Sequence, residues 1–313
     1  MNTPMRSFLA AVAAVWALGS LASFVYASQL GVPASIAIPT ALAFLLELTF
    51  YLTTGFDAIR RRWRPLTLFA SALAPFCLAS LAGPALHWRQ VSLLAFATAA
   101  VCFWFERGRR APWREFLLLF LMAAVMLAKP FRGIYADPFP GLRIDSLGQL
   151  MWFRIGLATF LGNGGPPLQL SFLPSARAFK IGALHFLAFM PVALLLNHFL
   201  QFTRLQPAPG FWWKAPATFL AFLFFVAFYE EVFFRGILQQ RLMQWWGRWA
   251  GLLAASALFG FVHLWFRGFP NYNWVILTFF LGLACGRAFL HAGIGASIVA
   301  HALVVAAWRG FFA

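Results

Sequence analysis

Two adjacent glutamates in a very apolar stretch are the first candidates for chemistry. Glu230 and Glu231 directly follow Tyr229 and the run 219–228, which consists only of Phe, Leu, Ala and Val. An ionisable group at membrane depth costs about 2.5 kcal/mol or more unless it is paired, so its presence there indicates a function. A carboxylate held in such surroundings can take up and release protons as a general base.

Helical geometry separates the roles of these charges. Glu231 and Arg235 are spaced i,i+4, so they lie on one helix face and can form an ion pair. Glu230 points about 100° away from Glu231. This geometry predicts that Arg235 holds Glu231 and that Glu230 faces a cavity. The alternative is a pair of interfacial charges at a helix end beside a snorkelling arginine.

Two histidines follow the glutamates in later apolar runs. His263 shares a helix face with Phe259 at i,i+4, and His301 lies within the apolar run 298–305. A lone histidine in an apolar helix is usually a hydrogen-bonded structural group. Two of them after a buried glutamate pair indicate an interior site, to which each of three helices contributes a polar residue. We expect structural roles for the other histidines, His87, His185, His198 and His291.

The composition is that of a membrane protein. Hydrophobic residues make up 62% of the 313 residues, and charged residues make up 10%. The 24 Lys and Arg against 8 Asp and Glu would suggest nucleic-acid binding in a soluble chain. Many of the cations, however, cluster between apolar runs, as at 60–64 and 107–110, which is typical of cytoplasmic loops. We therefore expect the lipid bilayer, and no nucleic acid, as a partner.

Apolar runs long enough for the bilayer predict the elements that position these residues. A spanning helix needs about 20 mostly apolar residues. The sequence therefore predicts an all-α, polytopic transmembrane bundle of about eight to ten helices, approximately at 7–28, 34–56, 66–86, 90–106, 115–130, 181–200, 214–234, 248–265, 272–290 and 293–309. The stretch 8–25 could also be a signal peptide, but its apolar length fits a retained first span better.

A few residues outside the glutamate block have more than one interpretation. Glu47 is the other acid deep in an apolar run, and it is either a proton-relay or transport carboxylate or a structural group. No basic partner at matching depth is evident, and we favour the structural role. The cysteines lie in apolar runs without CxxC spacing and are expected to be small core residues: Cys77, Cys102 and Cys285.

The ordered motifs carry a family resemblance. Glu230-Glu231-x-x-x-Arg235, then Phe259-x-x-x-His263, then His301 resembles the three-motif signature of the CPBP family. This family comprises the type II CAAX prenyl endopeptidases and the bacteriocin-processing or immunity proteins, also called Abi proteins. The stretches 279–286 and 295–298 are similar to the Gly-rich helix and the turn before the family's last histidine. The similarity covers about residues 212–308.

This resemblance implies an intramembrane endopeptidase that cleaves membrane-associated protein or peptide substrates. By the family pattern, Glu230 is the general base that activates water, His263 shares that water, and His301 stabilises the oxyanion. Supporting roles fall to Glu231, Arg235 and Phe259. Family members commonly carry Asn or Asp four residues after the last histidine, whereas this chain has Val305. Asn271 or Asn273 is a candidate to replace that polar group.

A catalytic zinc is the alternative to a metal-free site. Glu230, His263 and His301 are residue types that bind catalytic zinc. The usual HExxH spacing is absent, and the family has been described both as metalloproteases and as metal-independent glutamate peptidases. We favour a site without metal.

The long break in the apolar runs at 131–177, together with the resemblance, suggests a division of the chain. We expect amino-terminal transmembrane helices of unknown role at 1–130 and a loop or interfacial linker at 131–177, whose apolar part, 150–161, is too short to span. A CPBP-like protease domain would follow at 178–313. The expected location is a bacterial inner (plasma) membrane, with several passes. The alternative function is a non-catalytic peptide-binding or bacteriocin-immunity protein of the same fold, and a transporter using Glu47 is less favoured.

Overall fold

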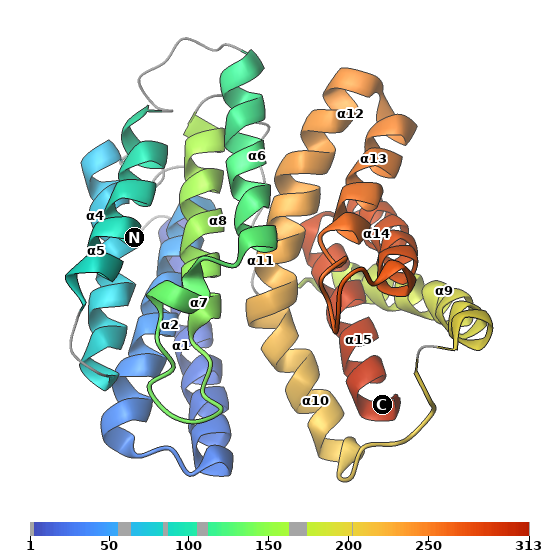
Figure 1. The fold of residues 1–313 in the computed structure, drawn as a ribbon, viewed down its shortest axis with the longest axis horizontal. Helices are drawn as coiled ribbons and strands as arrows, with labels where there is room; N and C mark the ends of the chain where they lie inside the picture. The colour runs from blue at the N-terminus through green and yellow to red at the C-terminus, as the bar shows by residue number, and fades with distance from the viewer. Residues whose placement is uncertain are drawn as a thin grey trace. The chain divides into compact units, whose positions relative to one another are not determined.

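The predicted all-helical membrane fold is confirmed. The computed structural model describes residues 3–55, 64–83, 87–104, 112–162, 174–201 and 203–312. Within these ranges seven helices are long and apolar enough to cross a membrane. The chain forms two compact units, Met1–Pro167 and Leu168–Ala313 (Figure 1). The basic residues 60–63 and 107–110, predicted to lie in cytoplasmic loops, are outside the described residues.

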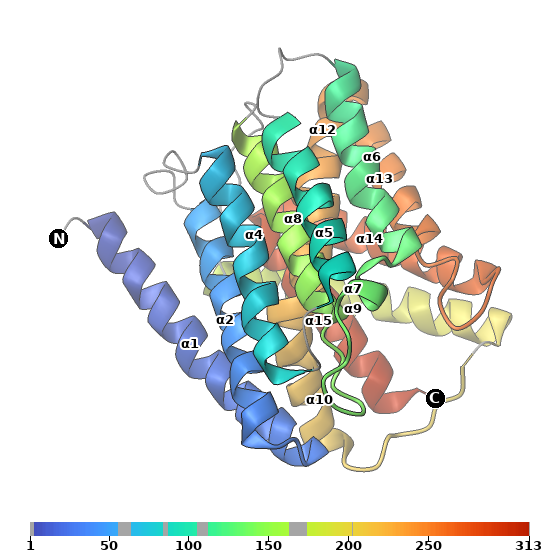
Figure 2. The ribbon, with the colours of Figure 1, turned by 60° about the vertical axis from the view of Figure 1, so that its left-hand side comes forward.

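The amino-terminal unit is a bundle around helix α2. Its helices are α1 (Thr3–Leu30), α2 (Ala34–Gly55), α4 (Pro65–Ala79), α5 (Trp88–Ala99), α6 (Pro112–Ala128), α7 (Phe131–Ile134) and α8 (Asp145–Gly162), with short η1 (Ser80–Ala82) after α4 and η2 (Ala100–Trp104) after α5. Helix α2 packs against α1, α4 and α8. Figure 2 shows α1 and α2 running side by side.

A buried ion pair joins α2 to α8. Arg154 Nε lies 2.5 Å from Glu47 Oε1, and Arg154 Nη2 lies 3.0 Å from Glu47 Oε2, with both side chains fully buried. The same guanidinium donates to the hydroxyl and the carbonyl oxygen of Ser71 on α4. Such bidentate pairing compensates for the desolvation of both charges. Glu47 therefore has a basic partner and a structural role, and the partner is a residue that the sequence analysis missed.

Arg154 lies in the segment that we expected to be a linker with an interfacial helix at 150–161. The structure instead has an 18-residue helix, α8, with buried residues all around its circumference. Close contacts fit this position, because a Cβ added at Gly156 would lie 2.3 Å from Met122 Sδ of α6. With its charge neutralised by Glu47, Arg154 can also be accommodated at the centre of the unit. The domain limits that we expected stay a prediction.

Among its described residues, the carboxyl-terminal unit contains one very long helix and four shorter ones. Its elements are α9 (Ala176–Leu200), α10 (Phe211–Ala221), η3 (Phe222–Val226), α11 (Ala227–Glu231), η4 (Val232–Gln239), α12 (Gln240–Trp246), α13 (Arg248–Phe261), α14 (Tyr272–Ala292) and α15 (Ile294–Phe311). The elements from α10 to α12 form one apolar helix of 36 residues, Phe211–Trp246. It ends at Gly247, whose φ of 83° lies in the left-handed region, and so extends well beyond the predicted 214–234.

Small residues bring the helices of this unit together. Helix α14 packs against α9, α13 and α15 (Figure 1). A Cβ at Gly282 would lie 3.0 Å from Ser256 Cα of α13, and a Cβ at Gly286 would lie 2.3 Å from Leu252 Cδ1. Glycine at these two positions therefore permits the close approach of α13 and α14. Gly293 has another purpose, since its φ of 74° forms the turn between α14 and α15.

Candidate active site

The two glutamates lie near the middle of the long helix. At 1.5 Å per residue, Glu230 is about 29 Å from Phe211 and about 24 Å from Trp246 along the helix axis. Exposed tryptophans at both ends, Trp212 and Trp246, are typical of the two membrane interfaces. Two π-helical segments, η3 and η4, flank the short α11 that carries the glutamates. Such π turns occur frequently at functional sites.

Glu231 is fully buried and its carboxylate is held by side chains from two helices. Arg235 Nη1 donates to Oε1 across 3.1 Å, and His301 Nδ1 lies 2.8 Å from the same oxygen. Ser297 donates its hydroxyl to Oε2. Arg235 also donates to the Gly282 carbonyl oxygen at 3.0 Å, which links the pair to α14. Three donors on one carboxylate make Glu231 a fixed anchor for α15.

Glu230 has different surroundings from its neighbour. His301 Nε2 lies 3.9 Å from Glu230 Oε2. The residue is 9% exposed, whereas Glu231 has no exposed surface. The geometry has the Glu231–Arg235 pair that the i,i+4 argument predicted. The cavity expected beside Glu230 stays a prediction.

Phe259 connects the remaining candidates. Its ring is fully buried and makes edge contacts with His263, at 5.0 Å between centroids, and with His301, at 5.6 Å. The Arg235 guanidinium lies over the same ring at 4.4 Å, a cation–π contact. One aromatic ring therefore places two histidines and the arginine that holds Glu231. The structure brings all six predicted site residues into one connected cluster, in which Phe259 joins His263 to the others.

Both histidines are fixed through Nδ1. His263 Nδ1 lies 2.8 Å from the Phe259 carbonyl oxygen, and His301 Nδ1 lies 2.8 Å from Glu231 Oε1. Because both oxygens only accept hydrogen bonds, each Nδ1 carries a proton. Nε2 is then the nitrogen that each histidine presents for chemistry, and in the neutral ring it holds the lone pair.

The sequence analysis missed Ser297 as part of this cluster. Ser297 is fully buried and lies four residues before His301 on α15, so both side chains face Glu231. The i,i+4 rule that paired Glu231 with Arg235 could also have paired Ser297 with His301. A small hydroxyl in a stretch of small residues gave too little signal to single it out.

Val305 stands four residues after His301, where family members commonly have a polar side chain. Neither Asn271 nor Asn273 bonds to His301 within the ranges that the structure describes. Asn271 instead caps α14, since its Oδ1 accepts from the Trp274 amide. The suggestion that Asn271 replaces the missing group is therefore wrong, because its side chain is engaged elsewhere.

The residues do not fit a bound metal. Among the described side chains, no three of His, Cys, Asp or Glu gather closely enough to hold a metal ion. Glu231 and the Nδ1 of His301 are engaged with each other, and Glu231 also neutralises Arg235. The groups left for zinc, Glu230 and the Nε2 atoms of His263 and His301, do not gather closely enough to hold one ion.

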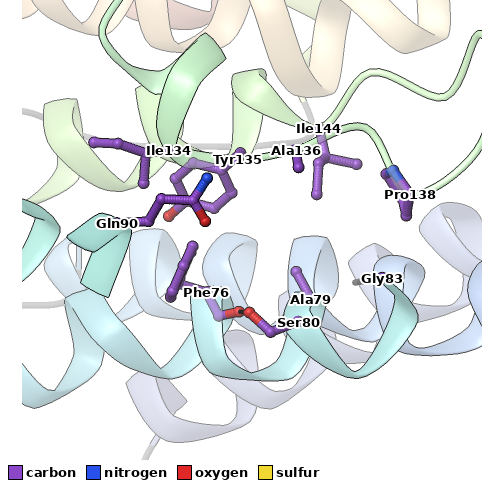
Figure 3. Close-up of a pocket in the computed structure, with 10 residues that line it drawn as sticks. All are labelled: Phe76, Ala79, Ser80, Gly83, Gln90, Ile134, Tyr135, Ala136, Pro138 and Ile144. Atoms are coloured by element: carbon purple, nitrogen blue, oxygen red, sulfur yellow. Dashed lines mark hydrogen bonds between the residues drawn. The ribbon is translucent and has the colours of Figure 1, made fainter. Parts of the chain in front are cut away.

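A separate pocket lies in the amino-terminal unit and contains none of the predicted site residues. Ten residues line it, from α4, η1, Gly83, α5 and the segment 134–144. Figure 3 shows Tyr135 and Gln90 at one end of it and Pro138 and Gly83 at the other. The Tyr135 hydroxyl is buried and has no hydrogen-bond partner. Burial raises the pKa of this phenol well above its usual range, so it stays a neutral donor.

The comparison with known families agrees with the arrangement of the carboxyl-terminal unit. Residues 212–307 match the model of the family described as Rce1-like, Type II CAAX prenyl endopeptidase Rce1-like. No curated protein and no solved structure matches the chain. The matched stretch begins in α10 and ends in α15, and it includes every residue of the cluster around Glu231. The predicted resemblance is confirmed: in residues 212–307, this integral multi-pass membrane protein is similar to the type II CAAX prenyl endopeptidases.

Proposed function

We propose that the chain is an intramembrane endopeptidase of the CAAX type, in which Glu230 activates the attacking water. The observation that carries the proposal is the contrast between the two carboxylates. The Glu231 carboxylate accepts hydrogen bonds from Arg235, Ser297 and His301. Glu230 is buried with 9% of its surface exposed, and its Oε2 lies 3.9 Å from His301 Nε2. A general base must have a free oxygen that water can reach, and neighbouring side chains must hold it in a rigid site.

Each site residue then has a defined step. Glu230 takes a proton from water while the water oxygen attacks the peptide carbonyl carbon. His263, fixed through Nδ1, accepts a hydrogen bond from the same water at Nε2. The tetrahedral intermediate collapses when its C–N bond breaks, and Glu230 returns the proton to the departing amine. The products are a new carboxyl terminus and a new amino terminus.

His301 is the proposed oxyanion donor. Its Nδ1 donates to Glu231, and this bond fixes the orientation of the ring. When Nε2 carries a proton, it can donate to the developing oxyanion, and such a hydrogen bond is strong where water is excluded. Glu231, Arg235, Ser297 and Phe259 act as positioning residues, because they touch His301 or one another rather than the reacting atoms.

The proposed substrates are membrane-anchored proteins or peptides, since the site lies at the middle of a spanning helix. No metal takes part in the proposed mechanism. The bacterial plasma membrane stays a prediction from the sequence.

The proposal is tested by comparing the termini of membrane proteins in two strains. One strain expresses the wild type and the other expresses Glu230→Gln at the same level. New termini that vanish in the variant are the expected result, and they would name substrates. Identical sets of termini, with both proteins folded and equally abundant, would contradict the proposal.

One observation favours a second candidate function. Val305 provides no polar donor beside His301, and a missing oxyanion donor has raised barriers by about 2.7–4 kcal/mol in other enzymes. A non-catalytic protein that binds a peptide, or confers bacteriocin immunity, could use the same cluster. Tight binding of a peptide without any cleavage by the wild type would favour this alternative.

A further inference from the structure

The loop after His263 is held in place by hydrogen bonds at its base. The Phe266 amide donates to the His263 carbonyl oxygen at 2.9 Å, and the Asn271 amide donates to the Leu264 carbonyl oxygen at 2.9 Å. The Asn271 side chain donates to the Phe266 carbonyl oxygen at 2.9 Å as well. The loop between α13 and α14 therefore presents its side chains from a defined backbone next to the candidate active site.

Arg267 lies at the tip of this loop and is exposed. Its φ of 57° is in the left-handed region, which non-glycine residues seldom occupy and which concentrates at functional sites. The guanidinium lies over the rings of Phe266 and Trp274, at 5.9 Å from each centroid. Within the described part of the chain, no carboxylate pairs with Arg267, although the buried arginines Arg154 and Arg235 are both paired with glutamates. The loop thus presents a positioned cation with no counter-ion of its own.

This cation is within reach of a peptide held in the site. The Phe266 ring is 6.4 Å from the His263 ring, and the Arg267 guanidinium is 5.9 Å from the Phe266 ring, so Arg267 lies within roughly 12 Å of His263. Three residues of extended chain span about 10 Å. A peptide whose carboxyl terminus is three residues beyond the scissile bond could therefore reach from His263 to Arg267.

The surroundings of Arg267 are aromatic. Trp265 and Phe269 are exposed and their rings stack at 4.0 Å, and Tyr272, at the start of α14, is 64% exposed. Exposed rings near a cation suit a short apolar peptide that ends in a charged group. The same features would suit a loop that rests at the membrane interface, so an experiment has to separate the two.

We propose that Arg267 forms a subsite for the terminal carboxylate of the substrate. This inference rests on the proposed function, because the matched family is named for CAAX motifs, which stand at the carboxyl end of a protein. Arginine binds a carboxylate through two parallel hydrogen bonds, which gives both affinity and a fixed direction. A peptide could occupy both the catalytic site and this subsite only if its scissile bond lies a few residues from its carboxyl terminus. It would therefore select substrates that are cleaved close to their carboxyl terminus.

The test uses one peptide in two forms. The probe is a short peptide with S-farnesylcysteine followed by three aliphatic residues, made as the free acid and as the carboxyl amide. Binding is measured with the full-length Glu230→Gln protein in lipid nanodiscs, where no cleavage disturbs the equilibrium. Because a hydrogen bond to a charged group discriminates by about tenfold to a hundredfold, the acid should bind tighter than the amide by that factor.

The variants assign this preference to one residue. Arg267→Gln should weaken binding of the acid to the level of the amide and leave the amide unchanged, whereas Arg267→Lys should keep part of the preference. Arg248→Gln is the matched control, since Arg248 is also exposed and lies over a ring, Trp249, at 5.3 Å. With Glu230 restored, Arg267→Gln should raise KM for the acid and change kcat little, because the carboxylate is bound equally before and during the reaction.

The outcomes separate the two proposals. If the wild type cleaves both peptides equally well, or if Arg267→Gln keeps the preference for the acid, the carboxylate subsite is overturned and the proposed endopeptidase stands. If neither peptide is bound or cleaved, the CAAX substrate class of the proposed function fails and the subsite fails with it.

Discussion

Glu231→Gln should destabilise the protein strongly and Glu230→Gln should leave its stability nearly unchanged, although both should abolish activity. Glu231 is the sole carboxylate partner of Arg235 within the described residues, and both side chains are buried. Its replacement by the neutral Gln leaves a buried guanidinium without a counter-ion. Within the described residues no arginine or lysine pairs with Glu230, whose Oε2 lies 3.9 Å from His301 Nε2.

The magnitude follows from the burial of the pair. Removal of one member of a buried ion pair costs about 3–5 kcal/mol of unfolding free energy, because the remaining charge stays desolvated. We therefore expect Glu231→Gln to destabilise the protein by about 3–5 kcal/mol. Glu230→Gln keeps the shape of the side chain and leaves no unpaired charge, so we expect a change within about 0.5 kcal/mol.

A double variant tests whether the unpaired charge is the cause. Glu231→Gln with Arg235→Met removes both charges and keeps an acceptor for Ser297 and His301, so it should recover most of the stability. Denaturant unfolding in detergent micelles, followed by tryptophan fluorescence, measures all three variants. A Glu231→Gln protein as stable as the wild type, or a double variant less stable than Glu231→Gln, would refute the reasoning.

Three further predictions follow from single contacts. Ser297→Ala removes one hydrogen-bond donor from the Glu231 carboxylate, so it should lower the unfolding free energy by about 1.5–3 kcal/mol and also lower kcat. Ser297→Thr keeps the hydroxyl and should restore part of the stability and of kcat. Unchanged stability and activity in Ser297→Ala would contradict this prediction. Tyr135→Phe should leave the unfolding free energy unchanged or raise it, because the Tyr135 hydroxyl has no hydrogen-bond partner. Tyr51→Phe should lower the unfolding free energy by about 1 kcal/mol, because the Tyr51 hydroxyl donates to the Leu150 carbonyl oxygen. Denaturant unfolding compares the two variants, and a larger loss of stability in Tyr135→Phe would contradict this prediction. Cleavage by the reconstituted protein should survive 1,10-phenanthroline, and a loss of activity that added zinc restores would overturn the metal-free mechanism.

Much of the site could be predicted from the sequence, because charged residues are rare in apolar membrane-spanning segments and are easily recognised there. Glu230, Glu231 and Arg235 stand out against the run 219–228, and the i,i+4 rule gives the Glu231–Arg235 pair directly. The rule also places Phe259 beside His263. Helix spacing alone could not show that Phe259 touches His301, because that contact depends on how α13 and α15 pack.

The residues that the sequence analysis missed, Arg154 and Ser297, have one thing in common. Each bonds to a glutamate from a distant segment of the chain. Glu47 lacked an evident partner because Arg154 is more than a hundred residues away on a helix that we expected to be interfacial. A buried arginine lowers the apolarity of its helix, and so α8 does not look like a buried helix until its partner is known. Likewise, Ser297 gains importance only when Glu231 of another helix is placed beside it.

The central claim, that Glu230 is the base of a peptidase, is tested most directly by cleavage in a purified system. The wild type and Glu230→Gln are reconstituted in lipid nanodiscs with a substrate identified from cellular termini, and the products are followed by mass spectrometry. The account predicts a single new pair of termini with the wild type. It also predicts a loss of at least about a hundredfold in kcat with Glu230→Gln at unchanged stability. Cleavage by Glu230→Gln at a rate within a few fold of the wild type would contradict it.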